Sequence, residues 1–301
     1  AFFRRQRQMC IRDRYISAGN EKGALTGHLF EDLSSKGVPA ALNGTSIPFE
    51  WNNLSNLKRI IEKNRDEIGA IKMEVTRNIK PSKDFLKRVR ELCDYYKILL
   101  IFDECTSGFR ETFGGLHLKY GIDPDISIFG KALGNGYAIS AVIGKEKVMN
   151  AAKESFISST FWTERIGNLA GLATLKEMKR LNSWNLITCL GEEIQNKWKL
   201  TAEEYGINIS VGVIPAIASF KFNYENNLEY KTFLTREFLK RNYLASNLLF
   251  VSTEHTKLDL SEYFEILKKI FETISLRESG VIKEKLIPDN ELCGETFKRL
   301  N

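Results

Sequence analysis

The chain has 301 residues, of which 43% are apolar and 27% charged, a composition typical of a folded protein with enough apolar material for two domains or subdomains. No apolar stretch approaches the ~20 residues of a membrane span and no signal-peptide pattern is present, so we expect no membrane partner. Of the formal net charge of +6, residues 1–14 contribute +4 through five arginines and one aspartate. The other residues show no basic stripe with interleaved aromatics, so we expect no nucleic-acid partner.

Cysteine and histidine usage argues against disulfides and metal centres. The five cysteines are scattered without a CxxC pair, and the chain has three histidines. An odd, unclustered set of cysteines in a chain of this size is typical of reduced thiols. We therefore expect a cytoplasmic protein without a metal site.

From about residue 55, helix and strand patterns alternate. Residues 55–67 place Leu57, Ile60 and Ile61 on one helical face, and residues 70–75 have the pattern of a short strand. Residues 82–97 repeat the helical spacing, with apolar positions at Phe85, Val89, Leu92, Cys93 and Tyr96.

Three apolar runs then follow, over residues 98–104, 125–131 and 138–145. Such continuous runs are typical of parallel strands that are covered on both faces. Alternating strands and helices predict an α/β fold with a mostly parallel central sheet and helices on both faces.

The pattern changes in the C-terminal part. Residues 164–206 are helical with little strand signal, and shorter strand and helix patterns follow. This predicts a smaller α+β domain with a boundary near residue 183, so the expected domains are 15–183 and 184–301. The basic segment 1–14 is expected to be a non-native or disordered arm.

The stretch SIFGKALGNGYA, residues 127–138, raises the question of what Lys131 does between a strand and a glycine-rich loop. A phosphate-binding loop would need glycine where Asp125 stands and a hydroxyl residue where Ala132 stands, so that interpretation fails. The dinucleotide fingerprint fails as well, because Ile139 occupies the place of its third glycine.

A nucleophilic lysine remains possible at this position. Lys131 and Asp103 both follow predicted strands, and the carboxyl ends of parallel strands form the ligand-binding edge of a sheet. A lysine amine at that edge can form a Schiff base with a carbonyl. A carboxylate beside it can hold the protonated ring nitrogen of pyridoxal phosphate. The alternatives are a solvated lysine and an aspartate that caps a helix or turn; Lys145, which also follows an apolar run and a glycine, is expected to be exposed.

Three blocks of sequence resemble a known enzyme family in order and spacing. They are LLIFDECTSGFR (99–110), GIDPDISIFGKALGNGYAISAVIG (121–144) and SSTFWTERIGNLAGLATLKEM (158–178). They resemble the class III pyridoxal-phosphate-dependent aminotransferases, in the branch similar to glutamate-1-semialdehyde aminomutase. The resemblance runs from about Tyr15 to the C-terminus and implies a fold-type-I transferase that forms a homodimer with shared active sites.

The resemblance assigns roles to five residues. It implies that Lys131 is the Schiff-base lysine and that Asp103 is the partner of the pyridine nitrogen. Cys105 matches a family valine on the ring face, and Thr106 matches a frequent glutamine near the ring hydroxyl. Thr160 matches the threonine that binds the cofactor phosphate of the neighbouring subunit.

Two departures from the family pattern bear on function. Thr163, Glu164 and Arg165 replace a common Gly-Asn-Pro, which predicts a subgroup with its own substrate and makes Glu164 and Arg165 candidate substrate contacts. Family members also carry some 130 or more residues before this chain begins, including a phosphate loop and a ring-stacking aromatic. We therefore expect a truncated chain that binds pyridoxal phosphate poorly or not at all.

The leading functional hypothesis is transamination, in which an amino group moves between a small-molecule amino donor and a carbonyl acceptor through a Lys131 Schiff base. One alternative is a 2,1-aminomutase of the glutamate-1-semialdehyde type, which would use the same residues. An alternative of another class is an inactive fragment or a non-catalytic assembly partner.

Overall fold

The computed structural model describes residues 14–18, 39–42, 44–76, 79–158 and 163–294. The described chain divides into two compact units, one up to residue 179 and one from residue 180 onward, with residue 79 grouped with the second unit. Most of the predicted arm lies outside the described residues, and Arg14, its last residue, begins the first strand. Among the described residues, no helix combines the length and apolarity needed to cross a membrane.

The first unit contains a six-stranded sheet in the order β2-β1-β3-β4-β5-β6. All neighbouring pairs are parallel except β5 and β6, which are antiparallel. The sheet consists of β1 (Arg14–Ala18), β2 (Ser46–Phe49), β3 (Ile68–Met73), β4 (Leu99–Asp103), β5 (Ile126–Phe129) and β6 (Ala141–Gly144). The predicted α/β fold with a mostly parallel sheet is confirmed.

The reversal of β6 follows from the short connection before it. Parallel neighbours need a crossover of about a dozen residues or more, usually a helix. Residues 130–140 instead hold a single 3₁₀ turn, Lys131–Leu133, and a glycine-rich loop. The chain therefore returns alongside β5, and Phe129 pairs with Ala141.

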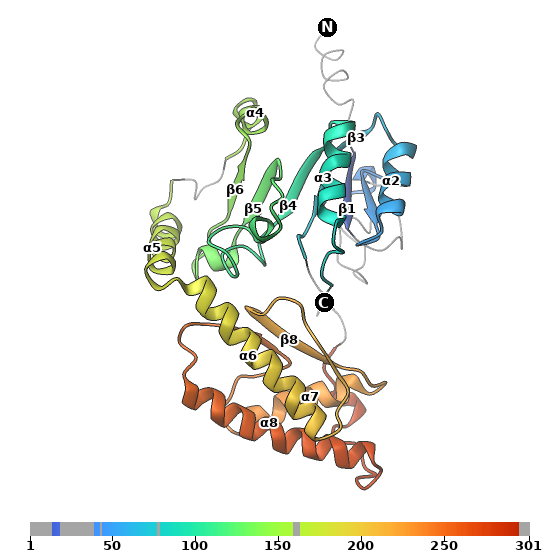
Figure 1. The fold of residues 1–301 in the computed structure, drawn as a ribbon, viewed down its shortest axis with the longest axis vertical. Helices are drawn as coiled ribbons and strands as arrows, with labels where there is room; N and C mark the ends of the chain where they lie inside the picture. The colour runs from blue at the N-terminus through green and yellow to red at the C-terminus, as the bar shows by residue number, and fades with distance from the viewer. Residues whose placement is uncertain (1–13, 19–38, 43, 77–78, 159–162, 295–301) are drawn as a thin grey trace. The chain divides into compact units, whose positions relative to one another are not determined.

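Two amphipathic helices supply the apolar layer against the sheet, α2 (Leu54–Lys63) and α3 (Phe85–Tyr96) (Figure 1). The predicted face of α2 is confirmed, since Leu57, Ile60 and Ile61 are all buried. Asn53 caps α2 by accepting a hydrogen bond from the Asn56 amide at 2.9 Å, which satisfies one of the free amides of the first turn. The shared core includes Phe85, Val89 and Cys93 from α3 with Ile71, Met73, Leu100 and Phe102 from the strands.

After β6, the first unit continues through a short helix, α4 (Glu146–Met149), to the long helix α5 (Arg165–Leu181). The buried side of α5 consists of Gly167, Gly171 and Met178. A Cβ on Gly167 would lie 3.0 Å from the Ala138 carbonyl oxygen, so small residues let this helix approach the glycine-rich loop closely.

The second unit has its own core, built on the antiparallel sheet β7-β8-β9. Trp198 lies at its centre, fully buried, and donates a hydrogen bond from Nε1 to the Tyr263 hydroxyl at 3.0 Å. Its elements are α6 (Ser183–Glu204), β7 (Ile209–Val211), β8 (Ile217–Phe222), α7 (Asn227–Leu239), β9 (Leu248–Phe250) and α8 (Lys257–Glu278). The small C-terminal α+β unit expected from the sequence is present.

Candidate active site

Two neighbouring strand ends bring the predicted site residues to one edge of the first unit's sheet. Asp103 is the last residue of β4 and pairs with Ile128 of the parallel strand β5. Lys131 follows three residues after Ile128, beyond the extended Gly130. This edge is the carboxyl end of both strands, where ligand sites of open parallel sheets form.

Lys131 has an unusual backbone conformation and a specific contact. Its φ of 43° lies in the left-handed region, which a side chain with a Cβ enters at a cost of roughly 1–3 kcal/mol. The turn around it compensates, because the Gly134 and Asn135 amides both donate to the Lys131 carbonyl oxygen at 3.1 Å. The exposed side chain donates from Nζ to Thr106 Oγ1 at 2.7 Å. Hydrogen bonds thus hold both the backbone carbonyl and the side-chain amine of Lys131.

Asp103 is held by two donors, one on each carboxylate oxygen. Oδ1 accepts a hydrogen bond from the Cys105 amide at 3.2 Å, and Oδ2 forms an ion pair with Lys72 Nζ at 3.0 Å. Burial opposes ionisation of Asp103, but the hydrogen bonds from Lys72 and Cys105 outweigh it and hold the pKa of this carboxyl below its usual range. The strand end therefore presents a stable negative charge.

The turn after β4 brings Cys105 and Thr106 into the same cluster. A Cβ on Gly130 would lie 3.6 Å from Cys105 Sγ, so the thiol faces the backbone next to Lys131. Burial, followed by the charge of Asp103, raises the pKa of Cys105, whereas the charges of Lys131 and Lys72 act in the opposite direction. The thiol is therefore neutral and behaves as a small apolar group at this edge.

A buried polar network lies directly behind this turn. Glu104 is fully buried and accepts hydrogen bonds from the His117 amide and from His117 Nδ1, both at 2.9 Å, and from the Ser107 hydroxyl. Burial opposes the charge of Glu104, but these donors outweigh it and lower its pKa. Gly115 gives the network its space, because a Cβ there would lie 2.3 Å from the His117 ring.

The remaining predicted residues have different surroundings. Glu164 accepts a hydrogen bond from the Ile166 amide at 2.8 Å, so its carboxylate caps the first turn of α5. Arg165 is the exposed first residue of that helix, and Thr160 lies outside the described residues. The structure thus groups Asp103, Cys105, Thr106 and Lys131, and it gives Glu164 a local structural contact.

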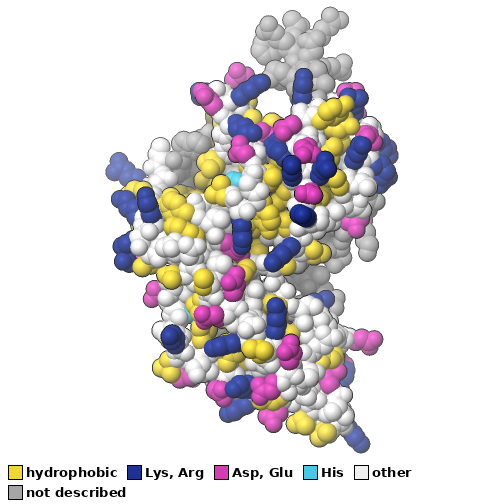
Figure 2. All heavy atoms as spheres, viewed as in Figure 1, with side chains coloured by type: hydrophobic (Ala, Val, Ile, Leu, Met, Phe, Trp, Pro, Cys, Tyr) yellow, Lys and Arg dark blue, Asp and Glu magenta, His cyan; other side chains and the backbone are white. Residues whose placement is uncertain are grey.

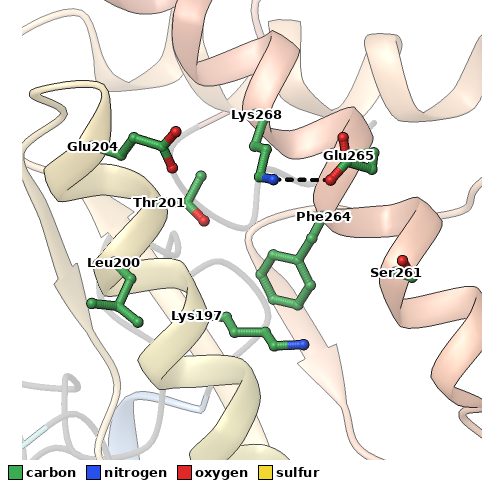
Figure 3. A pocket seen from close by; sticks show the side chains of 8 residues that line it. All are labelled: Lys197, Leu200, Thr201, Glu204, Ser261, Phe264, Glu265 and Lys268. Atoms are coloured by element: carbon green, nitrogen blue, oxygen red, sulfur yellow. Dashed lines mark hydrogen bonds and ion pairs between the residues drawn. The ribbon is translucent and has the colours of Figure 1, made fainter.

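The second unit has a pocket of about 270 Å³ between α6 and α8 (Figure 3). Lys268 forms an ion pair with Glu265 at 2.9 Å, and Lys197 Nζ lies 5.3 Å from the centre of the Phe264 ring. None of the predicted site residues lines this pocket.

The chain is similar to a known enzyme family over most of its length. A family model described as aminotransferase class-III matches residues 39–241. The chain belongs to the class-III aminotransferase family.

Two curated relatives illustrate the position of this class-III chain within the family. It is 31% identical over 245 residues to a 3-aminobutyryl-CoA aminotransferase of Cloacimonas acidaminovorans, an alignment that covers 77% of this chain and 59% of that protein. It is 31% identical over 284 residues to a glutamate-1-semialdehyde 2,1-aminomutase of Desulfitobacterium hafniense, covering 86% of this chain and 64% of that protein. The aligned chain thus spans roughly three fifths of the length of these relatives.

Solved transaminase structures confirm the predicted fold type. The FumI protein of Sphingopyxis sp. MTA144, solved in its PLP internal aldimine form, aligns with a TM-score of 0.79 at 19% identity and covers 91% of this chain and 69% of that one. An omega-transaminase of Sphaerobacter thermophilus aligns with a TM-score of 0.74 at 20% identity, covering 91% and 70%. The class-III chain therefore has the fold of the type I transferases.

Two parts of the site in this class-III chain were not predicted from the sequence. One is Lys72, whose signal was a charged residue between Ile71 and Met73 in an otherwise apolar strand. The other is the network of Glu104 with Ser107 and His117. The sequence features that could have indicated this network are the acidic Glu104 immediately after Asp103 and His117, one of the three histidines of the chain.

Proposed function

We propose that the protein is a pyridoxal-phosphate-dependent aminotransferase that moves an amino group between a small-molecule amino donor and a carbonyl acceptor. The observation that carries this proposal is the contact of Lys131 Nζ with Thr106 Oγ1, 2.7 Å, at the strand edge that holds the ionised Asp103. Family membership and the relatives named as aminotransferases support the same reaction class.

The described residues fit the ring half of pyridoxal phosphate. Asp103 keeps its charge, and a carboxylate has about four acceptor positions, so it can accept a hydrogen bond from a protonated ring nitrogen beside its present donors. Lys131 offers an exposed amine for covalent attachment to the aldehyde. Cys105 contacts Asp103 through its amide, and Thr106 contacts Lys131 through its hydroxyl. When bound, the cofactor supplies an electron sink for carbanion chemistry.

Lys131 then has two tasks in the proposed mechanism. Its amine would hold the cofactor, and its Nζ, when free, would move a proton at the substrate's α carbon. Thr106 Oγ1 keeps Nζ within reach, because a hydrogen-bond acceptor at 2.7 Å restrains a long and flexible side chain. Glu164 and Arg165 remain proposed substrate contacts.

We also propose a cytoplasmic homodimer with shared active sites, in which Thr160 binds the cofactor phosphate of the neighbouring subunit. An exposed apolar face of α5 supports the dimer, because Ile166 and Leu169 are 61% and 63% exposed and Leu172 continues the same face. Figure 2 shows apolar side chains open at the surface on the side of the view where α5 lies. Contiguous exposed apolar residues of this kind mark interaction surfaces.

The second candidate is a 2,1-aminomutase, favoured by the similarity to glutamate-1-semialdehyde aminomutases. It would use Lys131 and Asp103 in the same way but keep its intermediate bound. The third candidate is an inactive fragment or a non-catalytic assembly partner. Transfer of an amino group to an added keto acid distinguishes the first candidate from the other two.

The test is covalent labelling. The protein is incubated with pyridoxal phosphate, reduced with borohydride, and digested for peptide mapping. We expect the label on Lys131, its loss in Lys131→Ala, and its retention in Lys145→Ala, which removes another exposed lysine beside a strand. A label at another lysine, or a wild-type protein that takes up no label, would refute the enzyme proposal.

A further inference from the structure

Asp103 contacts a charged residue, Lys72, that is not among the predicted site residues. Lys72 Nζ lies 3.0 Å from Asp103 Oδ2, and 44% of the lysine side chain and 25% of the aspartate side chain remain exposed. Lys72 comes from β3, the strand next to β4. Its ion pair therefore links two strand ends at the candidate active site.

The sheet geometry explains why Lys72 faces this site. Lys72 is paired with Ile101 in the parallel register, whereas Ile71 is paired with Leu100 and Met73 with Phe102. Those two flanking pairs are buried against the helical layer. Because side chains alternate between faces, Lys72, Ile101 and Asp103 share the opposite face. The lysine therefore extends along the open face toward the end of β4.

The two donors on Asp103 hold its carboxylate in one orientation. The Cys105 amide occupies Oδ1 and Lys72 occupies Oδ2, so rotation of the carboxylate would break at least one of these bonds. The charges of both Lys72 and Lys131 act on the Cys105 thiol. The two lysines, the carboxylate and the thiol therefore form one electrostatic cluster.

We propose that Lys72 is a positioning residue for the cofactor's ring nitrogen: it fixes the Asp103 carboxylate and keeps it ionised when the medium becomes acidic. This inference rests on the proposed function, because the ring nitrogen is the group that Asp103 would bind. Lys72 touches Asp103 and acts through it.

Lys72 then sets the acid limit of cofactor binding. A protonated Asp103 loses its charge and one acceptor position, so it no longer attracts a positively charged ring nitrogen. Without Lys72, the carboxyl would gain its proton at a higher pH, because an adjacent opposite charge favours the ionised form. Affinity for pyridoxal phosphate should therefore begin to fall at a higher pH.

The experiment compares the wild type with Lys72→Met, Lys72→Arg and Lys145→Met. Methionine keeps an unbranched apolar stem without the charge, and arginine restores the charge. Lys145 is the matched control, because its side chain is 46% exposed and forms an ion pair with Asp125, also at 3.0 Å. Two quantities are measured across a pH series: the Asp103 carboxyl resonance of the cofactor-free protein and the dissociation constant of pyridoxal phosphate.

We expect Lys72→Met to move the Asp103 titration to higher pH and to weaken cofactor binding about threefold or more at the acid end, with a smaller change at alkaline pH. Lys72→Arg should restore both readouts, and Lys145→Met should leave both unchanged. An Asp103 titration that does not move, or a loss of affinity equal at every pH, would overturn the inference while borohydride labelling of Lys131 still supported the enzyme. A wild type without cofactor uptake would overturn both.

Discussion

Glu104 shows how a single buried residue can determine the shape of the candidate site. It is adjacent to Asp103 in sequence and is fully buried, whereas Asp103 faces the open side of the sheet. The His117 and Ser107 donors satisfy its charge. Because a buried charge without donors costs several kcal/mol, this network fixes the course of the chain from β4 to His117, and with it the positions of Cys105 and Thr106.

Replacement of Glu104 by glutamine should therefore destabilise the first unit. The glutamine side chain replaces one acceptor oxygen with an NH₂ group, which would face the His117 or Ser107 donors that now bind Glu104. We therefore expect Glu104→Gln to lower the free energy of unfolding by ~2–3 kcal/mol at neutral pH. Urea denaturation measures this loss. Glu91→Gln is the control, because Glu91 pairs with Arg88 at the surface with 47% of its side chain exposed, and its loss should be below ~1 kcal/mol.

The pH dependence of that loss tests its electrostatic cause. The lowered pKa of Glu104 means that its stabilisation is fully present above the unfolded-state pKa, about 4.3, and disappears as pH falls through the folded-state pKa. The difference between wild type and Glu104→Gln should therefore shrink in acid. A difference that stays constant with pH would instead indicate a packing effect.

At the scale of elements, two buried helical glycines differ in how closely a neighbouring segment packs against them. Gly191 in α6 and Gly171 in α5 are both buried. A Cβ on Gly191 would lie 2.1 Å from the Pro215 carbonyl oxygen, whereas the nearest atom to a Cβ on Gly171 is 3.6 Å away. The first glycine is required by a neighbouring backbone, and the second has room for a methyl group.

The two alanine variants should differ in their effect on the free energy of unfolding. Gly191→Ala should lose about 2 kcal/mol or more through steric overlap with backbone atoms that cannot rotate away. Gly171→Ala should be neutral or gain up to ~1 kcal/mol, because alanine favours the helix. Thermal unfolding followed by circular dichroism measures both. A stabilised Gly191→Ala would contradict the close approach of α6 to residue 215.

At the scale of the whole molecule, the exposed apolar face of α5 bears on assembly. The helix buries glycines on its inner side and exposes Ile166, Leu169 and Leu172. This reverses the usual distribution, in which large apolar side chains cover the core. A second copy of the chain is the partner that we propose for this face.

Charge on this face should therefore weaken self-association. We expect the double variant Ile166→Asp and Leu169→Asp to raise the dimer dissociation constant at least ~10-fold in sedimentation equilibrium, as for central apolar interface residues. Leu258→Asp is the control, since Leu258 is 68% exposed on α8. Equal effects of the two changes, or a wild type that stays monomeric at high concentration, would contradict the proposed homodimer.

The sequence by itself determined the order of the elements and the class of the fold. The apolar spacing of α2 and the runs that became β4 and β5 predicted the buried residues, because periodicity reflects which face meets a core. The directions of the three later strands, β4, β5 and β6, were not determined in this way. The β6 run resembles β5 in composition, and β6 is antiparallel because residues 130–140 connect it to β5 without a crossover helix.

The tertiary structure decided the contacts of the candidate site. Lys131 and Asp103 could be selected from their places at strand ends. The contact of Lys131 with Thr106 and the ion pair of Lys72 with Asp103, however, join residues 25 and 31 positions apart. Local sequence patterns do not predict such contacts, because the contacts depend on strand order, register and the face to which each side chain points. The sequence determined which chemical groups are present, and the fold determined which of them meet.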